Sequence, residues 1–130
     1  MAALRDIMTK KVVATSSDTA VSEVARRMVE GRVGSAVILQ GSWLAGIVTE
    51  RDVLRAAASG QDLTATAVSN WMTPDPMTAS GDMDSDEAAQ VMVANGFRHL
   101  PVMDGKELLG VVSIRDVLAA RIRRRTSTST

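Results

Sequence analysis

Two copies of one short polar pattern hold the residues of this 130-residue chain that are best suited to chemistry. Residues 49–52 read Thr-Glu-Arg-Asp and residues 113–116 read Ser-Ile-Arg-Asp, each after a Gly-apolar-apolar run. A hydroxyl at a helix start lies beside free backbone N–H groups that favour an anion. An aspartate one turn later can accept both hydroxyls of a ribose. The pattern therefore predicts two candidate nucleotide-binding sites.

A second interpretation of the same pattern needs no ligand. Thr-x-x-Asp and Ser-x-x-Asp also fit a capping box, in which side chain and backbone at a helix start satisfy each other. For a single copy this interpretation is favoured. Because both copies place Arg51 or Arg115 directly before the aspartate, the duplicated pattern favours nucleotide binding.

The duplication extends well beyond these residues. Asp116 follows Asp52 by 64 positions (116 − 52), and the same offset relates the two copies without a gap from Ile7 to Ala56. Two copies at so long a period do not form a solenoid. They predict a pseudo-symmetric pair with a cleft between its halves.

Apolar periodicity predicts the elements that position the two patterns. Val21, Val24, Ala25, Met28 and Val29 form one stripe of a helix that ends at Gly31. Gly and Asp-Gly turns separate paired strand-like runs. The expected order in each copy is strand, helix, strand, strand, helix. In the first copy, strands are expected at 12–13, 36–39 and 44–48, and helices at 21–31 and 49–58. In the second copy, strands are expected at 100–103 and 108–112, and helices at 85–95 and 114–123.

This order predicts an α/β (α+β) fold built from two β-α-β-β-α repeats. We expect the first repeat at 1–61, a linker at 62–70, the second repeat at 71–123, and a basic and polar C-terminal tail at 124–130. Pro101 within its strand predicts a strand start or an edge strand.

The repeat resembles the cystathionine-β-synthase-type (CBS) domain, and two in tandem resemble the pair called a Bateman module. The resemblance is carried by the Gly-apolar-apolar-Thr/Ser-x-x-Asp phrase and by residues 6–9, Asp-Ile-Met-Thr. It implies that the repeats pack through small sheets about a pseudo-two-fold axis. It also implies clefts between the repeats for adenosine-containing ligands: AMP, ADP, ATP, S-adenosylmethionine or NAD.

Residue by residue, the resemblance places the ligand's base, ribose and phosphates on matching positions of both repeats. The first-repeat set is Thr9, Val13, Gly34, Ser35, Thr49, Arg51 and Asp52. The second-repeat set is Thr73, Met77, Arg98, His99, Ser113, Arg115 and Asp116. The dipeptide that faces the phosphates is Arg98-His99 in the second repeat but the uncharged Gly34-Ser35 in the first. We therefore expect the second-repeat site to bind a phosphate chain more tightly.

Composition limits the other functions. Fifteen Lys and Arg balance 15 Asp and Glu, so no excess charge indicates nucleic acid. The absence of cysteine and a single histidine exclude a thiolate or His/Cys metal site, and no catalytic motif is present. No signal core or membrane-length apolar run is seen. The expectation is a cytoplasmic non-enzyme without metal or cofactor and without a membrane or nucleic-acid partner.

The sequence thus predicts an energy or metabolite sensor that binds an adenosine-containing small molecule and acts on an unknown regulated protein. Small-residue helix faces after Val53 and Val117 predict a two-fold homodimer. The alternative is a structural dimerisation or scaffold module in which both patterns serve only as caps.

Overall fold

The computed structural model describes residues 2–128, with side chains described as far as Arg123. The chain divides into two compact units. One unit comprises Val12–Pro76, and the other combines Met1–Lys11 with Met77–Thr130. The segment that leads into the first repeat, residues 1–11, therefore belongs to the unit of the second repeat. The segment that leads into the second repeat, residues 71–76, belongs to the unit of the first repeat. We call this arrangement the exchange of leading segments.

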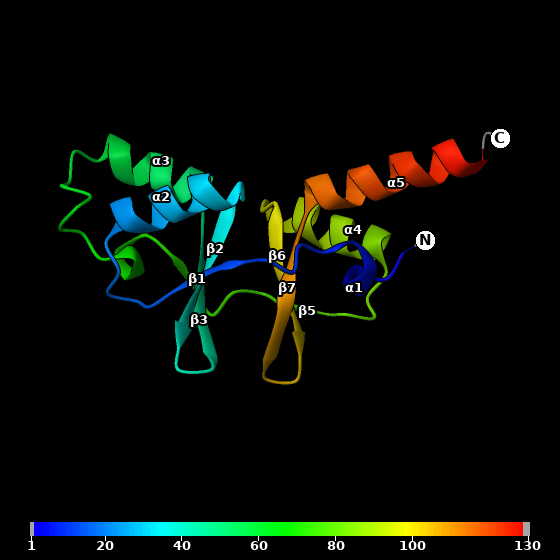
Figure 1. The fold of residues 1–130 in the computed structure, drawn as a ribbon, viewed down its shortest axis with the longest axis horizontal. Helices are drawn as coiled ribbons and strands as arrows, with labels where there is room; N and C mark the ends of the chain where they lie inside the picture. The colour runs from blue at the N-terminus through cyan, green and yellow to red at the C-terminus, as the bar shows by residue number, and fades with distance from the viewer. Residues whose placement is uncertain (1, 129–130) are drawn as a thin grey trace. The chain divides into compact units, whose positions relative to one another are not determined.

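The unit formed by Val12–Pro76 has a four-stranded sheet in the order β1-β2-β3-β4 (Figure 1). The first two strands are parallel, and the next two pairs are antiparallel. The expected hairpin is present, with Gly41 in its turn at φ +61°. The elements are β1 (Val13–Thr15), α2 (Val21–Gly31), β2 (Ser35–Gln40), β3 (Trp43–Thr49), α3 (Glu50–Ala58), the 3-10 helix η1 (Val68–Asn70) and β4 (Thr73–Pro74).

The other unit repeats this plan with a three-stranded sheet in the order β5-β6-β7. Its elements are α1 (Leu4–Ile7), β5 (Ala79–Ser80), α4 (Ser85–Asn95), β6 (His99–Asp104), β7 (Glu107–Ser113) and α5 (Ile114–Thr128). Helix α5 continues past its expected end near Arg123, and the last two residues of the predicted tail, Ser129 and Thr130, lie outside the described residues. The mixed α+β fold class is confirmed.

Pro101 lies in the middle strand of this sheet, β6, so the edge-strand prediction is wrong. Pro101 is not a strand start either, because β6 begins at His99 and Pro101 is its third residue. Pro101 pairs with Val111 of β7, whereas β5 reaches β6 only at Val102 and Met103. The missing N–H of proline therefore faces no partner strand.

Each leading segment packs against a strand of the other repeat at a glycine, Gly110 in β7 and Gly46 in β3. Thr9 and Val111 exchange two backbone hydrogen bonds of 2.9 and 3.0 Å across β7. A Cβ at Gly110 would lie 2.5 Å from the carbonyl oxygen of Thr9. In the other unit, a Cβ at Gly46 would lie 2.9 Å from the carbonyl oxygen of Thr73. Only glycine lets the crossing backbone come this close.

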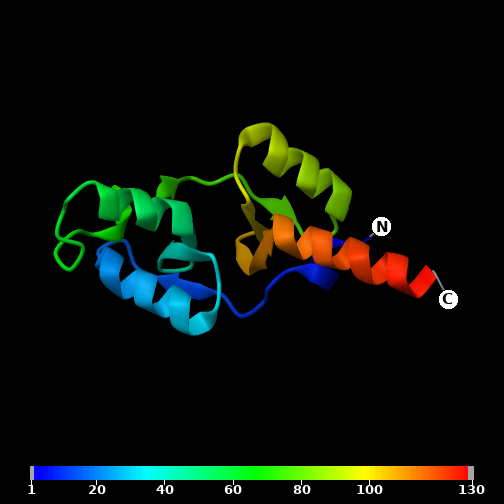
Figure 2. The same cartoon turned by 90° about the horizontal axis from the view of Figure 1, so that it is seen from above.

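Each unit buries its own apolar core. Helices α2 and α3 lie side by side over one sheet, and α4 and α5 do so over the other (Figure 2). The predicted stripe of α2 is confirmed at Val21, Val24 and Met28, which are buried. Val29 was placed on the same stripe but is 78% exposed, because it lies beyond the width of the face that meets the sheet.

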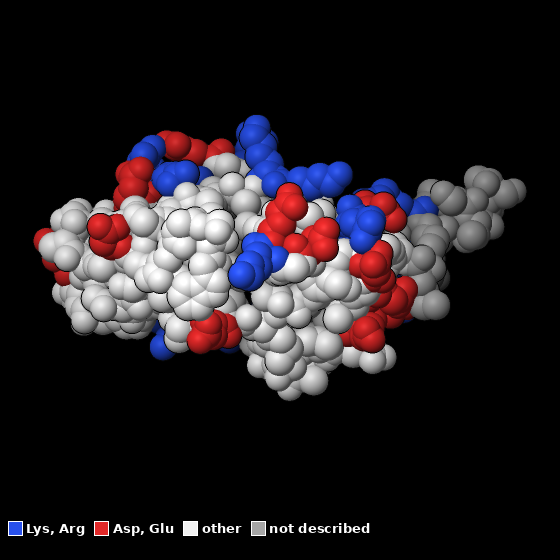
Figure 3. Space-filling view, turned by 90° about the horizontal axis from the view of Figure 1, so that it is seen from below, with Lys and Arg blue, Asp and Glu red and all other residues white. Residues whose placement is uncertain are grey.

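Among the described residues, no helix combines the length and apolar character that a membrane crossing requires. Basic and acidic side chains both appear on the face drawn in Figure 3, in keeping with a formal net charge of zero.

Candidate functional site

The junction of β7 and α5 carries the second copy of the polar pattern. The Asp116 N–H donates to Ser113 Oγ at 3.0 Å, and the Ser113 N–H donates to Asp116 Oδ2 at 2.9 Å. This is a complete capping box. Asp116 Oδ1 accepts no hydrogen bond from the described part of the chain, and this carboxylate is half-buried.

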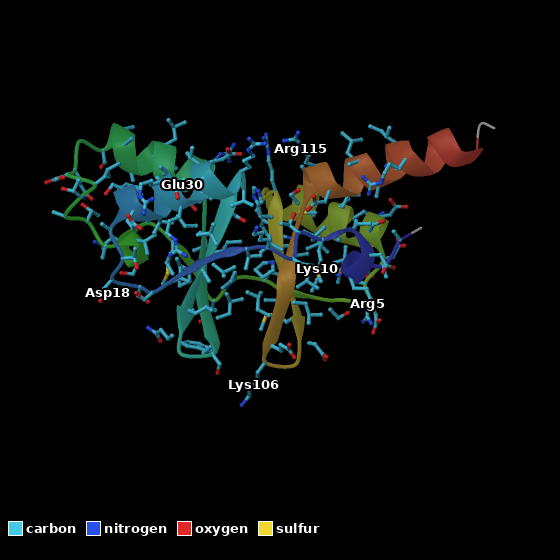
Figure 4. The ribbon with its side chains drawn as sticks, in the orientation of Figure 1. Arg5, Lys10, Asp18, Glu30, Lys106 and Arg115 are labelled. Atoms are coloured by element: carbon cyan, nitrogen blue, oxygen red, sulfur yellow. The ribbon has the colours of Figure 1, made fainter. Side chains whose placement is uncertain are left out.

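Three more residues of the predicted second-repeat set lie at this junction. The antiparallel register places His99 opposite Ser113, and the Ile114 N–H donates to the carbonyl of Arg98 at 3.0 Å. Arg115 lies in the first turn of α5 (Figure 4). Arg98 and Arg115 are exposed. The junction therefore combines a helix N-terminus, a hydroxyl, a carboxylate and two arginines within one unit.

Thr9 joins this second-repeat group rather than the first-repeat set in which the sequence placed it. Its backbone pairs with Val111, two residues before Ser113. Met77 belongs to the same unit and is 49% exposed. Seven predicted site residues thus belong to this one unit: Thr9, Met77, Arg98, His99, Ser113, Arg115 and Asp116.

The junction of β3 and α3 repeats the arrangement with tighter packing. The Thr49 N–H donates to Asp52 Oδ2 at 2.9 Å, and the Asp52 N–H donates to Thr49 Oγ1 at 3.4 Å. Thr49 Oγ1 also lies 3.1 Å from Asp52 Oδ2. Asp52 is only 7% exposed.

Four more residues of the first-repeat set belong to the same unit: Gly34, Ser35, Arg51 and Val13. The Glu50 N–H donates to the carbonyl of Gly34 at 3.0 Å, and Ser35 pairs with Thr49. Arg51 is exposed, while Val13 is buried in the core of the unit. Thr73, from the second-repeat set, pairs with Ile47 of β3 and so belongs to this unit.

One side chain that the sequence pattern did not single out contacts Asp52 directly. Arg55 Nη1 lies 3.3 Å from Asp52 Oδ1, and the Arg55 guanidinium lies 5.7 Å from the ring centroid of Trp71. A signal was available in the duplication, because the position that matches Arg55 in the second copy is Ala119.

The structure gives the acidic run before α4 a structural role. Asp84 is the N-cap of α4 and accepts a hydrogen bond from the Asp86 N–H at 3.1 Å. Asp82 pairs with Arg5, and Asp86 pairs with Arg121. No group of three or more His, Asp or Glu side chains within the described residues is arranged to hold a metal ion.

Comparison with known proteins gives a consistent match over both repeats. The CBS domain model matches residues 4–59 and again 68–123. The CBS domain-containing protein YhcV of Bacillus subtilis is 31% identical over 118 residues, which cover 90% of this chain and 84% of that protein.

Two solved structures share the fold over almost their whole length. The CBS-domain containing protein ATU1752 from Agrobacterium tumefaciens is 28% identical, with a TM-score of 0.84 over 92% of this chain and 99% of that one. The CBS domain pair of protein MJ0100, solved in complex with 5′-methylthioadenosine and S-adenosyl-L-methionine, has a TM-score of 0.82 at 23% identity. It covers 100% of this chain and 99% of its own, and shows likeness of fold alone.

Proposed function

We infer that this chain, which belongs to the CBS-domain family as a tandem pair, is a regulatory module that binds an adenosine-containing ligand. The ligand contacts are proposed at the β7–α5 and β3–α3 junctions. MJ0100 shares this fold and binds two ligands that contain adenosine. That observation supports the ligand class, and the residues of this chain support the places.

The observation that carries the proposal is the state of Asp116. Its Oδ2 caps α5, while its Oδ1 accepts no hydrogen bond from the described residues. The cap uses one oxygen of this carboxylate and leaves the other able to accept a further hydrogen bond. The second oxygen is positioned to accept a ribose hydroxyl, and the first-turn N–H groups of α5 favour a nearby phosphate.

The positive charge at this junction favours a phosphorylated ligand over a bare nucleoside. Arg98 and Arg115 are exposed beside Ser113, and arginine forks match phosphate oxygens in geometry. Gly34, the first-repeat counterpart of Arg98, contributes no charge. We therefore propose that the second-repeat site is the tighter of the two for nucleoside phosphates, and that a neutral or monophosphorylated ligand suits the first.

Regulation requires the ligand to distinguish two conformations of the protein. A ligand that binds both equally tightly shifts nothing, whatever its affinity. We propose that the bound ligand favours one conformation and that a partner protein recognises it. The ligand is released unchanged, and chromatography of the ligand after incubation tests this.

Self-association is part of the proposal and rests on duplicated apolar exposure. Val29 and Val93 are exposed at matching positions of α2 and α4, and Leu54 and Leu118 are exposed at matching positions of α3 and α5. Large apolar side chains exposed in equivalent places suit a symmetric homodimer. Sedimentation of wild type and of Leu54→Glu/Leu118→Glu tests this, with a monomeric variant expected.

Thermal unfolding in the presence of candidate ligands tests the ligand proposal. AMP, ADP, ATP, S-adenosylmethionine and NAD are each added at millimolar concentration to wild type and to Asp116→Ala. A ligand at 100 times its Kd adds about 2.7 kcal/mol to the free energy of unfolding, which is visible as a rise in Tm. We expect one ligand to raise the Tm of wild type and to have a much smaller effect on Asp116→Ala.

A structural dimerisation module is the second candidate, because both capping boxes are complete without a ligand. It predicts that none of the five ligands changes the Tm. It also predicts that Asp116→Ala lowers the Tm by the same amount with and without ligand.

A further inference from the structure

We propose that Arg55 sets the ligand affinity of the first-repeat site by occupying the carboxylate oxygen of Asp52 that a ribose hydroxyl would need. The inference rests on the proposed function, since it assigns a competitor to one of the two proposed sites. It makes Arg55 a specificity-determining residue and the two repeats unequal sites.

Every oxygen of the Asp52 carboxylate already has a donor from its own unit. Oδ2 accepts from the Thr49 N–H at 2.9 Å and lies 3.1 Å from Thr49 Oγ1. Oδ1 accepts from Arg55 Nη1 at 3.3 Å. The Asp52 side chain is 10% exposed, whereas that of Arg55 is 62% exposed. A ribose hydroxyl that approaches Oδ1 therefore meets the exposed guanidinium of Arg55 and competes with it for this oxygen.

Arg55 is held on its other side by an aromatic ring. Its guanidinium lies 5.7 Å from the ring centroid of Trp71, and the Trp71 indole N–H donates to Gln61 Oε1 at 3.2 Å. Trp71 follows η1 directly, and Gln61 follows the end of α3. The ring is thus oriented by a second contact, and the guanidinium is placed between a carboxylate and an aromatic partner.

The second repeat lacks this competitor. Ala119 lies at the position that matches Arg55, three residues after Asp116. Within the described residues, the Asp116 carboxylate accepts only the Ser113 N–H, and it is less buried than Asp52. The duplication therefore supplies an internal comparison in which one aspartate is occupied and its counterpart is open.

The size of the effect follows from the contacts that a ligand must displace. An exposed ion pair and an exposed cation–π contact are each modest. Loss of both changes an affinity by about threefold to twentyfold. The sign is informative, because removal of a positive charge by itself weakens the binding of an anionic ligand, whereas removal of a competitor strengthens it.

Calorimetric titration of reciprocal variants with AMP and with S-adenosylmethionine tests the inference. In the Asp116→Asn background the second site is disabled, so the titration reports the affinity of the first site. The double variant Asp116→Asn/Arg55→Ala is expected to bind the ligand at the first site about threefold to twentyfold more tightly than Asp116→Asn does. Asp52→Asn leaves the second site, and addition of Ala119→Arg to it is expected to lower affinity by a similar factor. Arg27→Ala, which removes a positive charge from the same unit, is the matched control and is expected to leave affinity unchanged or weaker.

Tryptophan fluorescence provides a second readout from the same proteins. In a Trp43→Phe background, Trp71 is the remaining tryptophan. Saturation of Trp43→Phe/Asp116→Asn with AMP is expected to change the Trp71 emission, because Arg55 leaves the ring. The change is expected to vanish in the further variant Arg55→Ala.

The outcomes separate this inference from the function on which it rests. If the first site binds a probe but Arg55→Ala does not raise its affinity, the role of Arg55 as a competitor is overturned and the proposed function stands. If Arg55→Ala weakens binding, Arg55 is instead a ligand contact. Binding of neither probe to wild type overturns the proposed function, and this inference with it.

Discussion

Gly110→Ala is the substitution that most sharply tests how the leading segment packs on β7. The added Cβ would lie 2.5 Å from the Thr9 carbonyl oxygen and 3.1 Å from Met8 Sδ. The Thr9 backbone cannot move freely, because it exchanges two hydrogen bonds with Val111. Overpacking of this kind costs about 1–3 kcal/mol. Replacement of glycine in a strand returns about 0.5–1 kcal/mol through the unfolded chain.

Because the close contact is with a backbone atom, the upper part of the overpacking range applies, and the expected net loss for Gly110→Ala is about 1–2.5 kcal/mol. This corresponds to a fall in Tm of roughly 4–9 °C for a domain of this size. Differential scanning calorimetry measures it. Gly31→Ala, in α2, is the matched control, because its Cβ would lie at an ordinary 3.4 Å from Val13 Cγ2. We expect this substitution not to lower the free energy of unfolding. A Gly110→Ala protein as stable as Gly31→Ala would refute the close crossing of Thr9 over β7.

Three further predictions concern local features of the helices. Arg32→Gly should raise the free energy of unfolding by about 1 kcal/mol, because Arg32 ends α2 in the left-handed conformation at φ 56°. The matching residue at the end of α4 is Gly96. Urea denaturation measures the change, and a lower free energy of unfolding would indicate a favourable role for the Arg32 side chain. Asp84→Ala should lower the free energy of unfolding by about 1 kcal/mol through loss of the N-cap of α4, and an unchanged urea midpoint would contradict that role. A hydrogen bond from Arg26 lowers the pKa of Glu23 below 4.5, so this carboxylate stabilises the fold above pH 4.5 and less as the pH falls through its folded pKa. The stability advantage of wild type over Glu23→Gln should therefore be larger at pH 7 than at pH 3, and a constant difference would remove the ion pair as its cause.

Much of the fold could be predicted because its signals are local. The helix expected at 85–95 is the observed α4 (Ser85–Asn95), since Asp84 caps its start and Gly96 ends it in the left-handed conformation. Both hairpins follow from their glycine turns. The resemblance to a tandem CBS pair is likewise confirmed by the matches at 4–59 and 68–123.

The exchange of leading segments could not be predicted from periodicity. Residues 8–9 and 72–73 are short and carry no strand pattern of their own, and their partner is chosen by contacts with β7 and β3 far along the chain. The sequence did contain one relevant feature, the glycine at positions 46 and 110, but a glycine does not name the backbone that approaches it.

The candidate site shows the same division. Thr49 with Asp52 and Ser113 with Asp116 form the hydrogen bonds that their spacing predicts, because a capping box needs only one helix turn. The contact of Arg55 with Trp71 was not predicted, because it depends on how the chain returns after α3. The exposure of Val29 likewise depends on the width of the covered face rather than on the apolar stripe.

The most direct test of adenosine-ligand binding is a titration of the ¹⁵N-labelled 13.8 kDa protein with AMP and S-adenosylmethionine, followed by amide chemical shifts. We predict saturable shifts that are largest for Ser113, Asp116 and the neighbouring Thr9 and that are lost in Asp116→Asn. Shifts that saturate elsewhere, or that Asp116→Asn leaves intact, would contradict binding at the β7–α5 junction. No shift with either ligand would support the structural dimerisation module.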